Sequence, residues 1–171
     1  MIDRTAIAAA LPDYMAGYVA QAPEGELLTI LQAQMDTTRE FYRSLVPEKE
    51  TYRYAEGKWT PREVVGHLSD SERVFQYRAM RFARNDRTDL PGFEQDDYVI
   101  ADNANERSMT DLLAELRAVR QGSIYLLRSL PESTLMRGGT ANGLEVTVAG
   151  LFLATVGHVV HHERVIRERY L

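Results

Sequence analysis

Residues 151–169 read LFLATVGHVVHHERVIRER, and the spacing of the side chains in this stretch decides the fold. Steps of three and four residues trace one seam of a helix, which we expect to face the axis of a bundle. The seam contains Leu151, Thr155, His158, His162, Val165 and Arg169. The neighbouring stripe begins with small residues and ends with charged ones, which predicts a close-packed flank that emerges into solvent. This stripe contains Gly150, Ala154, Gly157, His161, Arg164 and Glu168.

Three further segments show the apolar period of an amphipathic helix. The second of them has the clearest start signal, because Thr60 can act as N-cap, Pro61 occupies the first turn and Glu63 completes a capping box. Four amphipathic helices without a sustained alternating pattern predict an all-α fold, a four-helix bundle. The three segments are expected at about Glu24 to Leu45, from Thr60 through Phe82, and from Ser108 to Leu130.

The remaining segments are expected to connect these helices. Met1 to Ala20 predicts a short N-terminal helical segment that is broken at Pro12. Residues 85–105 are polar and without a period, which predicts a long loop between the second and third long helices rather than another element. Residues 138–143 are typical of a turn cluster, and residues 144–148 have weak strand character, although Thr147 could instead cap the last helix.

Composition limits the class of protein. The 171 residues predict a single domain spanning 1–171, and 44% apolar with 26% charged residues is ordinary for a soluble globular protein. The formal net charge of −5 disfavours a nucleic-acid partner. We expect no membrane contact and a cytoplasmic location, because no apolar run spans a bilayer and Met1 to Arg4 lacks the order of a signal peptide.

The histidines are the candidate functional residues. His158 and His162 are four residues apart, which places both imidazoles on one face of a helix, where a divalent metal can bridge them. His67 lies on the inner face of the second long helix, so two adjacent helices would form a three-histidine metal site. His161 falls outside this set. The alternative is that these are hydrogen-bonded core histidines without a metal.

Other motifs and residue types narrow the chemistry. The chain lacks cysteine, so a thiol would have to arrive with a substrate, and imidazole ligands favour Zn, Ni, Fe or Cu over Mg or Ca. Ile166 stands where a zinc peptidase HExxH motif needs histidine, and no histidine follows a glutamate by three residues. Trp59 and Tyr98 could line a pocket, although an aromatic residue such as Trp59 just before a capped helix is more often a packing staple. Several charged residues could assist the reaction at the metal site or could simply belong to solvated helix faces: Asp70, Glu72, Arg78, Arg81 and residues 94–97.

Several motifs resemble the DinB-like superfamily, which includes the YfiT-type metal-dependent hydrolases. The resemblance runs from about Tyr14 to the C-terminus. Its motifs are Trp59–Pro61, GHLSDSE at 66–72, PGFEQDDY at 91–98, Leu130–Pro131 and HVVHH at 158–162.

The resemblance implies a four-helix bundle, often a homodimer, that binds one divalent metal ion, nickel or zinc, through three histidines. These positions fall on His67, His158 and His162, the same three residues that the helical pattern brings together. Characterised relatives include transferases and isomerases that use a low-molecular-weight thiol. We therefore expect a small-molecule substrate and a transferase that activates such a thiol as cosubstrate. The alternatives are a hydrolase that uses a metal-bound water and a non-catalytic metal or small-molecule binding protein.

Overall fold

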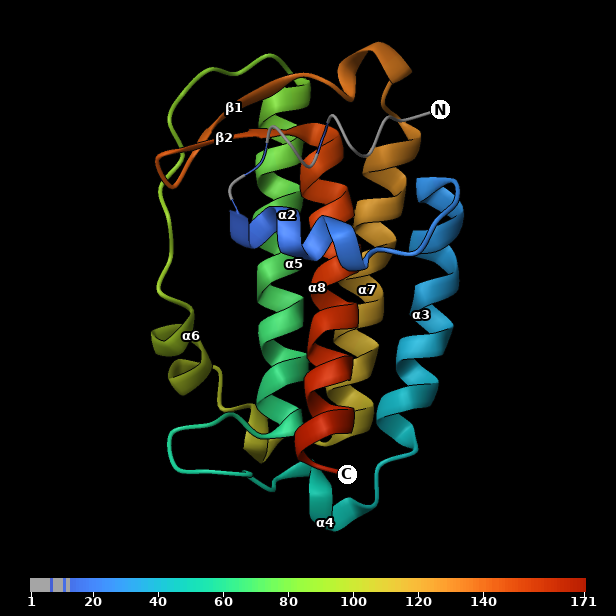
Figure 1. Ribbon diagram of the computed structural model, residues 1–171, viewed down its shortest axis with the longest axis vertical. Helices are drawn as coiled ribbons and strands as arrows, with labels where there is room; N and C mark the ends of the chain where they lie inside the picture. The colour runs from blue at the N-terminus through green and yellow to red at the C-terminus, as the bar shows by residue number, and fades with distance from the viewer. Residues whose placement is uncertain (1–6, 8–10, 12) are drawn as a thin grey trace.

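The computed structural model describes Ile7, Leu11 and residues 13–171 of the chain. The long helices run side by side as a bundle, and a shorter helix, α2, crosses in front of the bundle (Figure 1). The elements are α2 (Asp13–Gln21), α3 (Leu27–Arg43), α4 (Pro47–Glu50), α5 (Pro61–Ala83), α6 (Gln95–Ala101), η1 (Ala104–Glu106), α7 (Met109–Arg128), η2 (Glu132–Thr134), β1 (Gly138–Ala141), β2 (Leu144–Thr147) and α8 (Val148–Arg169). The predicted four-helix bundle is confirmed.

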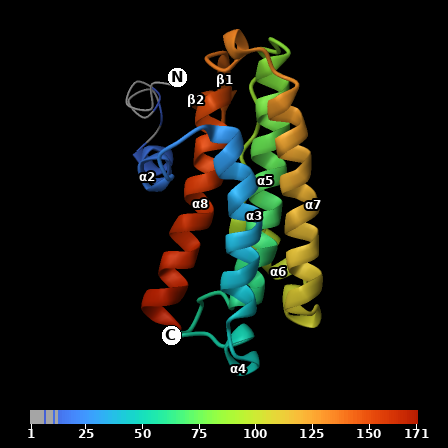
Figure 2. The same ribbon diagram turned by 90° about the vertical axis from the view of Figure 1, so that its right-hand side faces the viewer.

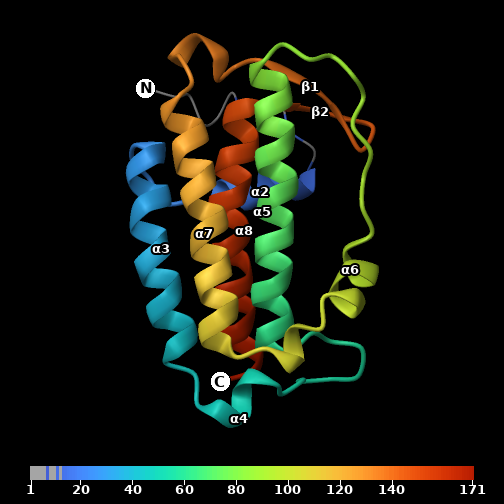
Figure 3. The ribbon, with the colours of Figure 1, turned by 180° about the vertical axis from the view of Figure 1, so that it is seen from behind.

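The long helices pack in the cyclic order α3, α7, α5, α8, because each contacts the two next to it in this series. The view from behind shows α7 in front of α8 and between α3 and α5 (Figure 3). The side view shows α2 packed on the outer side of α8 (Figure 2). None of the helices in the described part of the chain is long and apolar enough to cross a membrane.

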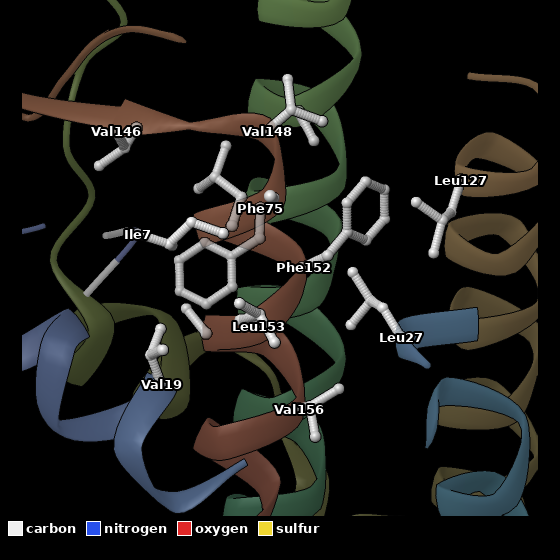
Figure 4. Packing of buried hydrophobic residues seen from close by; sticks show 14 of the residues in the cluster. Ile7, Val19, Leu27, Phe75, Leu127, Val146, Val148, Phe152, Leu153 and Val156 are labelled. Atoms are coloured by element: carbon white, nitrogen blue, oxygen red, sulfur yellow. The ribbon is translucent and has the colours of Figure 1, made fainter. Parts of the chain in front are cut away.

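The apolar core is divided into two clusters along the bundle axis. One cluster includes Phe75, Phe152 and Val156, which lie among side chains from α2, α3 and α7 (Figure 4). The other cluster includes Leu68 and Val159. Each long helix carries buried polar residues at or near the boundary between the two apolar groups: Gln34 and Thr38, His67 and Glu72, Arg120, and His158. The bundle therefore has a polar layer at mid-height, which we call the polar belt, and this layer positions the histidines.

Local signals set the start of the helices that carry the histidines. At α5, Thr60 Oγ1 accepts a hydrogen bond from the Glu63 N–H, and the Glu63 carboxylate accepts from the Thr60 N–H. At α8, Thr147 Oγ1 accepts from the Gly150 N–H. These caps satisfy backbone donors that would otherwise have no partner, so the register of the helix that follows is defined from its first turn.

The prediction for residues 85–105 is wrong in part, because this connection contains α6 and η1. Val99 is the buried residue of α6, so one apolar contact with the bundle was too little to produce a detectable period. Asp96 and Asp97 occupy the first turn of α6, where negative charge favours a helix. A short helix of this kind is held by its neighbours rather than by its own amphipathic pattern.

The predicted turn cluster at residues 138–143 is also wrong in part. Residues Gly138–Ala141 form β1, which pairs antiparallel with β2 in a hairpin that begins with Gly138 opposite Thr147. The turn is confined to Asn142 and Gly143, whose φ angles of 55° and 72° suit a tight hairpin. Both readings of Thr147 are confirmed, since it ends β2 and also caps α8.

The small-residue stripe of α8 is the surface on which α2 packs. A Cβ placed on Gly157 would lie 1.8 Å from the carbonyl oxygen of Tyr18, which is backbone and cannot rotate away. We expect Gly157→Ala to lower the free energy of unfolding by about 3 kcal/mol, the upper part of the range for overpacking. Urea denaturation followed by circular dichroism measures the change.

The matched control is Gly17→Ala on α2, where an added Cβ would have nothing within 4 Å. This exposed helical position should become about 0.5–1 kcal/mol more stable, because alanine is the better helix former. Equal effects of the two substitutions would show that the close approach of α2 and α8 does not matter.

Candidate metal centre

Helices α5 and α8 bring together the three histidines that the sequence singled out. Nε2 of His158 lies 3.1 Å from Nε2 of His67 and 2.9 Å from Nε2 of His162. Each of the three residues offers a ring nitrogen within 4.8 Å of the others. The three rings meet edge to face, with centroid separations of 4.6 to 5.1 Å. The convergence expected from the helical spacing is therefore present.

Burial keeps the three imidazoles neutral. His67 and His158 are buried, with 4% and 5% of their surface exposed, and His162 is half-buried. Burial lowers the pKa of His67 to about 4. Burial and then the neighbouring imidazoles lower the pKa values of His158 and His162 well below their usual range. At neutral pH the site therefore presents nitrogens rather than positive charges.

The three nitrogens cannot satisfy one another by hydrogen bonding. A ring nitrogen of a neutral imidazole carries either one N–H or one lone pair. Nε2 of His158 faces two nitrogens but can form a hydrogen bond with only one of them. A divalent cation would accept a lone pair from all three.

The separations of the nitrogens also suit a cation. Two imidazole nitrogens at about 2.0–2.1 Å from one ion, with a right angle between them, lie about 3 Å apart. This value agrees with the 3.1 Å and 2.9 Å found here. The donor set and its dimensions therefore fit one divalent metal ion, and the remaining directions around the ion would be free for a ligand.

The surroundings of the trio are aromatic. The ring of Trp59 lies 4.6 Å from that of His67 and 6.1 Å from that of His162, measured between centroids. Tyr18 of α2 lies 5.0 Å from His158, and Phe75 of α5 lies 6.2 Å from it. Among the described residues, no carboxylate, lysine or arginine makes a hydrogen bond, ion pair or ring contact with the three imidazoles.

The other candidates lie outside the trio. His161 is half-buried, and its ring contacts Tyr18 and His162 from the side. Tyr98 is exposed and contacts Phe93 rather than a histidine. The four charged candidates on α5 have partners elsewhere: Asp70 binds Arg73, Glu72 binds Arg120, Arg78 donates to the Pro91 carbonyl and Arg81 binds Asp86. Residues 94–97 are exposed and form the start of α6.

The sequence did not reveal two features of the site. One is Tyr18, whose position beside His158 was indicated only by Gly157, the residue that allows α2 to approach. The other is the buried ion pair of Glu72 and Arg120, with 2.7 Å between Oε1 and Nε. None of these three residues carried a local pattern, because their contacts depend on how the helices are aligned.

We expect the metal-free protein to lose stability as the pH falls from about 6.5 to 4. Below pH 6.5 the unfolded chain takes up protons on histidines that the folded chain keeps neutral, so protonation favours unfolding. The pKa of His67 is about 4 in the folded chain, against an ordinary value of 6.5. This difference lowers the free energy of unfolding by about 3 kcal/mol once the pH is below 4. His158 and His162 act in the same direction.

Urea unfolding of chelator-treated protein between pH 4 and 8 measures this dependence. His67→Gln is the matched variant, because glutamine does not titrate, and its stability should fall less steeply over the same interval. Parallel profiles for the two proteins would contradict the assignment.

The comparisons with known proteins agree with this picture. A family model described as the DinB superfamily matches residues 14–166. The chain belongs to the DinB superfamily. Among curated relatives, the Putative metal-dependent hydrolase OB0413 of Oceanobacillus iheyensis is 26% identical over 140 residues, which cover 80% of this chain and 79% of the relative.

Two solved structures share the fold. YfiT from Bacillus subtilis, described as a probable metal-dependent hydrolase with an unusual four-helix bundle topology, has a TM-score of 0.72 and 20% identity. That match covers 83% of this chain and 82% of YfiT. The DinB-like protein YjoA from Bacillus subtilis has a TM-score of 0.59 and 18% identity, and covers 84% of this chain and 88% of YjoA. At these identities the structures support the bundle topology itself.

Proposed function

We propose that this member of the DinB superfamily is a metal-dependent enzyme in which His67, His158 and His162 hold one divalent cation, nickel or zinc. The observation that carries the proposal is the convergence of three neutral imidazoles, two buried and one half-buried, with Nε2 of His158 about 3 Å from Nε2 of each of the other two. The name of the Oceanobacillus relative and the description of YfiT support the dependence on a metal.

The cation would supply Lewis acidity that lowers the pKa of an incoming water or thiol. The three imidazoles are neutral ligands and would leave the charge of the ion undiminished. Helices α5 and α8 hold the rings at fixed separations, so little reorganisation is needed when a ligand binds. The rings of Trp59 and Tyr18 lie beside this position, 4.6 Å from His67 and 5.0 Å from His158 between centroids.

We propose transfer of a low-molecular-weight thiol as the reaction, with a small molecule as the second substrate. The thiol proton passes to solvent, the sulfur forms a bond to an electrophilic carbon, and the leaving group departs with the electron pair. Amide or ester hydrolysis usually requires a side chain that protonates the leaving group. Within the described residues no carboxylate is hydrogen-bonded to the trio, so we favour a substrate that brings its own nucleophile.

Hydrolysis is the second candidate, and the names of the relatives favour it. Both reactions would use the same three histidines and the same cation. Thiol transfer depends on an added thiol, whereas hydrolysis does not.

Turnover assays with nickel-loaded, zinc-loaded and chelator-treated protein test the proposal. We expect conjugation of a small thiol to 1-chloro-2,4-dinitrobenzene by the loaded protein and loss of this activity after chelation. Cleavage of 4-nitrophenyl acetate without thiol would favour hydrolysis instead. Binding of the metal without turnover in either assay, across a panel of thiols, electrophiles and esters, would favour a binding protein over an enzyme.

A further inference from the structure

The side of the trio that solvent reaches is bordered by aromatic rings. His162 and its neighbour His161 are half-buried, as are Tyr18 and Trp59. The opposite side is closed, because His67, His158 and Phe75 are exposed by only 4%, 5% and 8%. A molecule that enters the site therefore passes along the half-buried edge, where it meets Tyr18 and Trp59. We call these two residues the aromatic rim.

The two rings of the aromatic rim come from separate elements and flank different histidines. Trp59 precedes α5 and lies nearly parallel to His162, with 21° between the ring planes. Tyr18 belongs to α2 and is inclined by 55° to His158. Backbone contacts fix the positions of Trp59 and Tyr18 without involving their rings. The Tyr170 hydroxyl donates a hydrogen bond to the Trp59 carbonyl, and the Tyr18 carbonyl packs closely against Gly157.

The charged residues of this part of α8 are engaged elsewhere. Glu163 accepts a hydrogen bond from Thr38, 2.8 Å between oxygens, and lies 3.6 Å from Arg167. Arg164 lies 4.0 Å from Glu168 on the exposed face of the helix. An entering molecule would therefore meet the half-buried rings of Tyr18 and Trp59 beside the imidazoles rather than an unpaired charge of this helix. The faces of aromatic rings favour flat apolar groups, which stack on them, over groups that must keep their water.

We propose that Tyr18 and Trp59 determine specificity by holding a flat apolar part of the substrate while its reactive group binds the cation. This inference rests on the proposed function, because it assumes a cation at the three histidines. It assigns to the aromatic rim a positioning role that is independent of which nucleophile reacts.

Two probes with the same metal-binding group test the inference. Acetohydroxamate and benzohydroxamate differ by a methyl and a phenyl group, and calorimetry on nickel-loaded protein measures both dissociation constants. We expect benzohydroxamate to bind about tenfold more tightly than acetohydroxamate, as stacking on one or two rings predicts. Trp59→Ala should reduce this preference to about twofold and change acetohydroxamate binding by less than about twofold. Trp59→Phe should retain most of the preference.

Tyr18→Leu provides a second variant on another element and should also reduce the preference, so the test does not depend on the folding of Trp59→Ala. Tyr98→Ala is the matched control, because Tyr98 is an exposed aromatic residue with no contact to a histidine. Nickel content and circular dichroism verify each variant.

The outcomes separate the two proposals. Equal binding of both probes by the unaltered protein, or a preference that survives in Trp59→Ala and in Tyr18→Leu, would overturn the role of the aromatic rim and leave the metal site intact. Failure of the unaltered protein to retain either nickel or zinc would overturn the proposed function first.

Discussion

Replacing His67 with alanine is expected to weaken nickel or zinc binding by more than about a hundredfold. Loss of residues that only support a ligand costs 10- to 100-fold, and His67 would be one of three direct ligands. The chain has a single tryptophan, Trp59, whose ring lies 4.6 Å from that of His67 and 6.1 Å from that of His162. A nickel ion bound to the three nitrogens should therefore quench its fluorescence, with an end point at one ion per chain. This quenching should be absent at the same concentrations in His67→Ala.

His161→Ala is the matched control for this experiment. His161 adjoins His162 in sequence and in space, yet it lies outside the group of three nitrogens that approach one another. Its replacement should leave the end point and the stoichiometry unchanged. Elemental analysis of protein purified without a metal-affinity tag gives an independent reading. Stoichiometric metal in His67→Ala, or its loss in His161→Ala, would show that the ligand set is wrong.

The histidine trio could be predicted from the sequence because its signals are local. The four-residue spacing places His158 and His162 on one face of a helix whatever the rest of the chain does. The capping box at Thr60 defines where α5 begins, so His67 falls on its buried face. The remaining requirement was that α5 and α8 be neighbours, which is a common arrangement in a bundle of four helices.

The features that could not be predicted depend on contacts between distant segments. Tyr18 reaches His158 only because α2 crosses α8 at Gly157. The helix α6 has Val99 as its buried residue, so its sequence carries no period. Glu72 and Arg120 are charged, and charged residues on helices are usually solvated, so their burial had no signal in the sequence. In each case the partner is set by helix alignment rather than by neighbouring residues.

The polar belt explains why one such contact matters for stability. Arg120 donates from Nε to Glu72 Oε1 at 2.7 Å and from Nη1 to Gln34 Oε1 at 2.8 Å. Gln34 in turn donates to the carbonyl of Val156, the residue two positions before His158. Glu72 and Arg120 are almost fully buried, with side-chain exposures of 2% and 4%. The chain of contacts joins α5, α7, α3 and α8 at the level of the histidines.

Arg120→Met is therefore expected to destabilise the fold by about 3–5 kcal/mol, since it would leave the Glu72 carboxylate buried without its counter-ion. Oε2 of Glu72 already lacks a hydrogen-bond partner among the described residues, so the carboxylate has no second donor to replace the arginine. Guanidinium unfolding followed by circular dichroism measures the loss. Adding Glu72→Leu should restore most of it, because a buried ion pair can often be exchanged for apolar side chains at little cost. A residual loss of about 1–2 kcal/mol is expected from Oε1 of Gln34, which loses the arginine as its donor.

Arg117→Met on the same helix is the control, because it removes an exposed ion pair rather than a buried one. Arg117 lies 2.9 Å from Asp36, but the two side chains are 47% and 58% exposed. Solvent screens such a pair, and its removal should cost at most about 1 kcal/mol. If Arg120→Met cost no more than Arg117→Met, the polar belt would contribute little to stability. If the double variant were no more stable than Arg120→Met, the penalty would arise from lost packing of the arginine rather than from the orphaned carboxylate of Glu72.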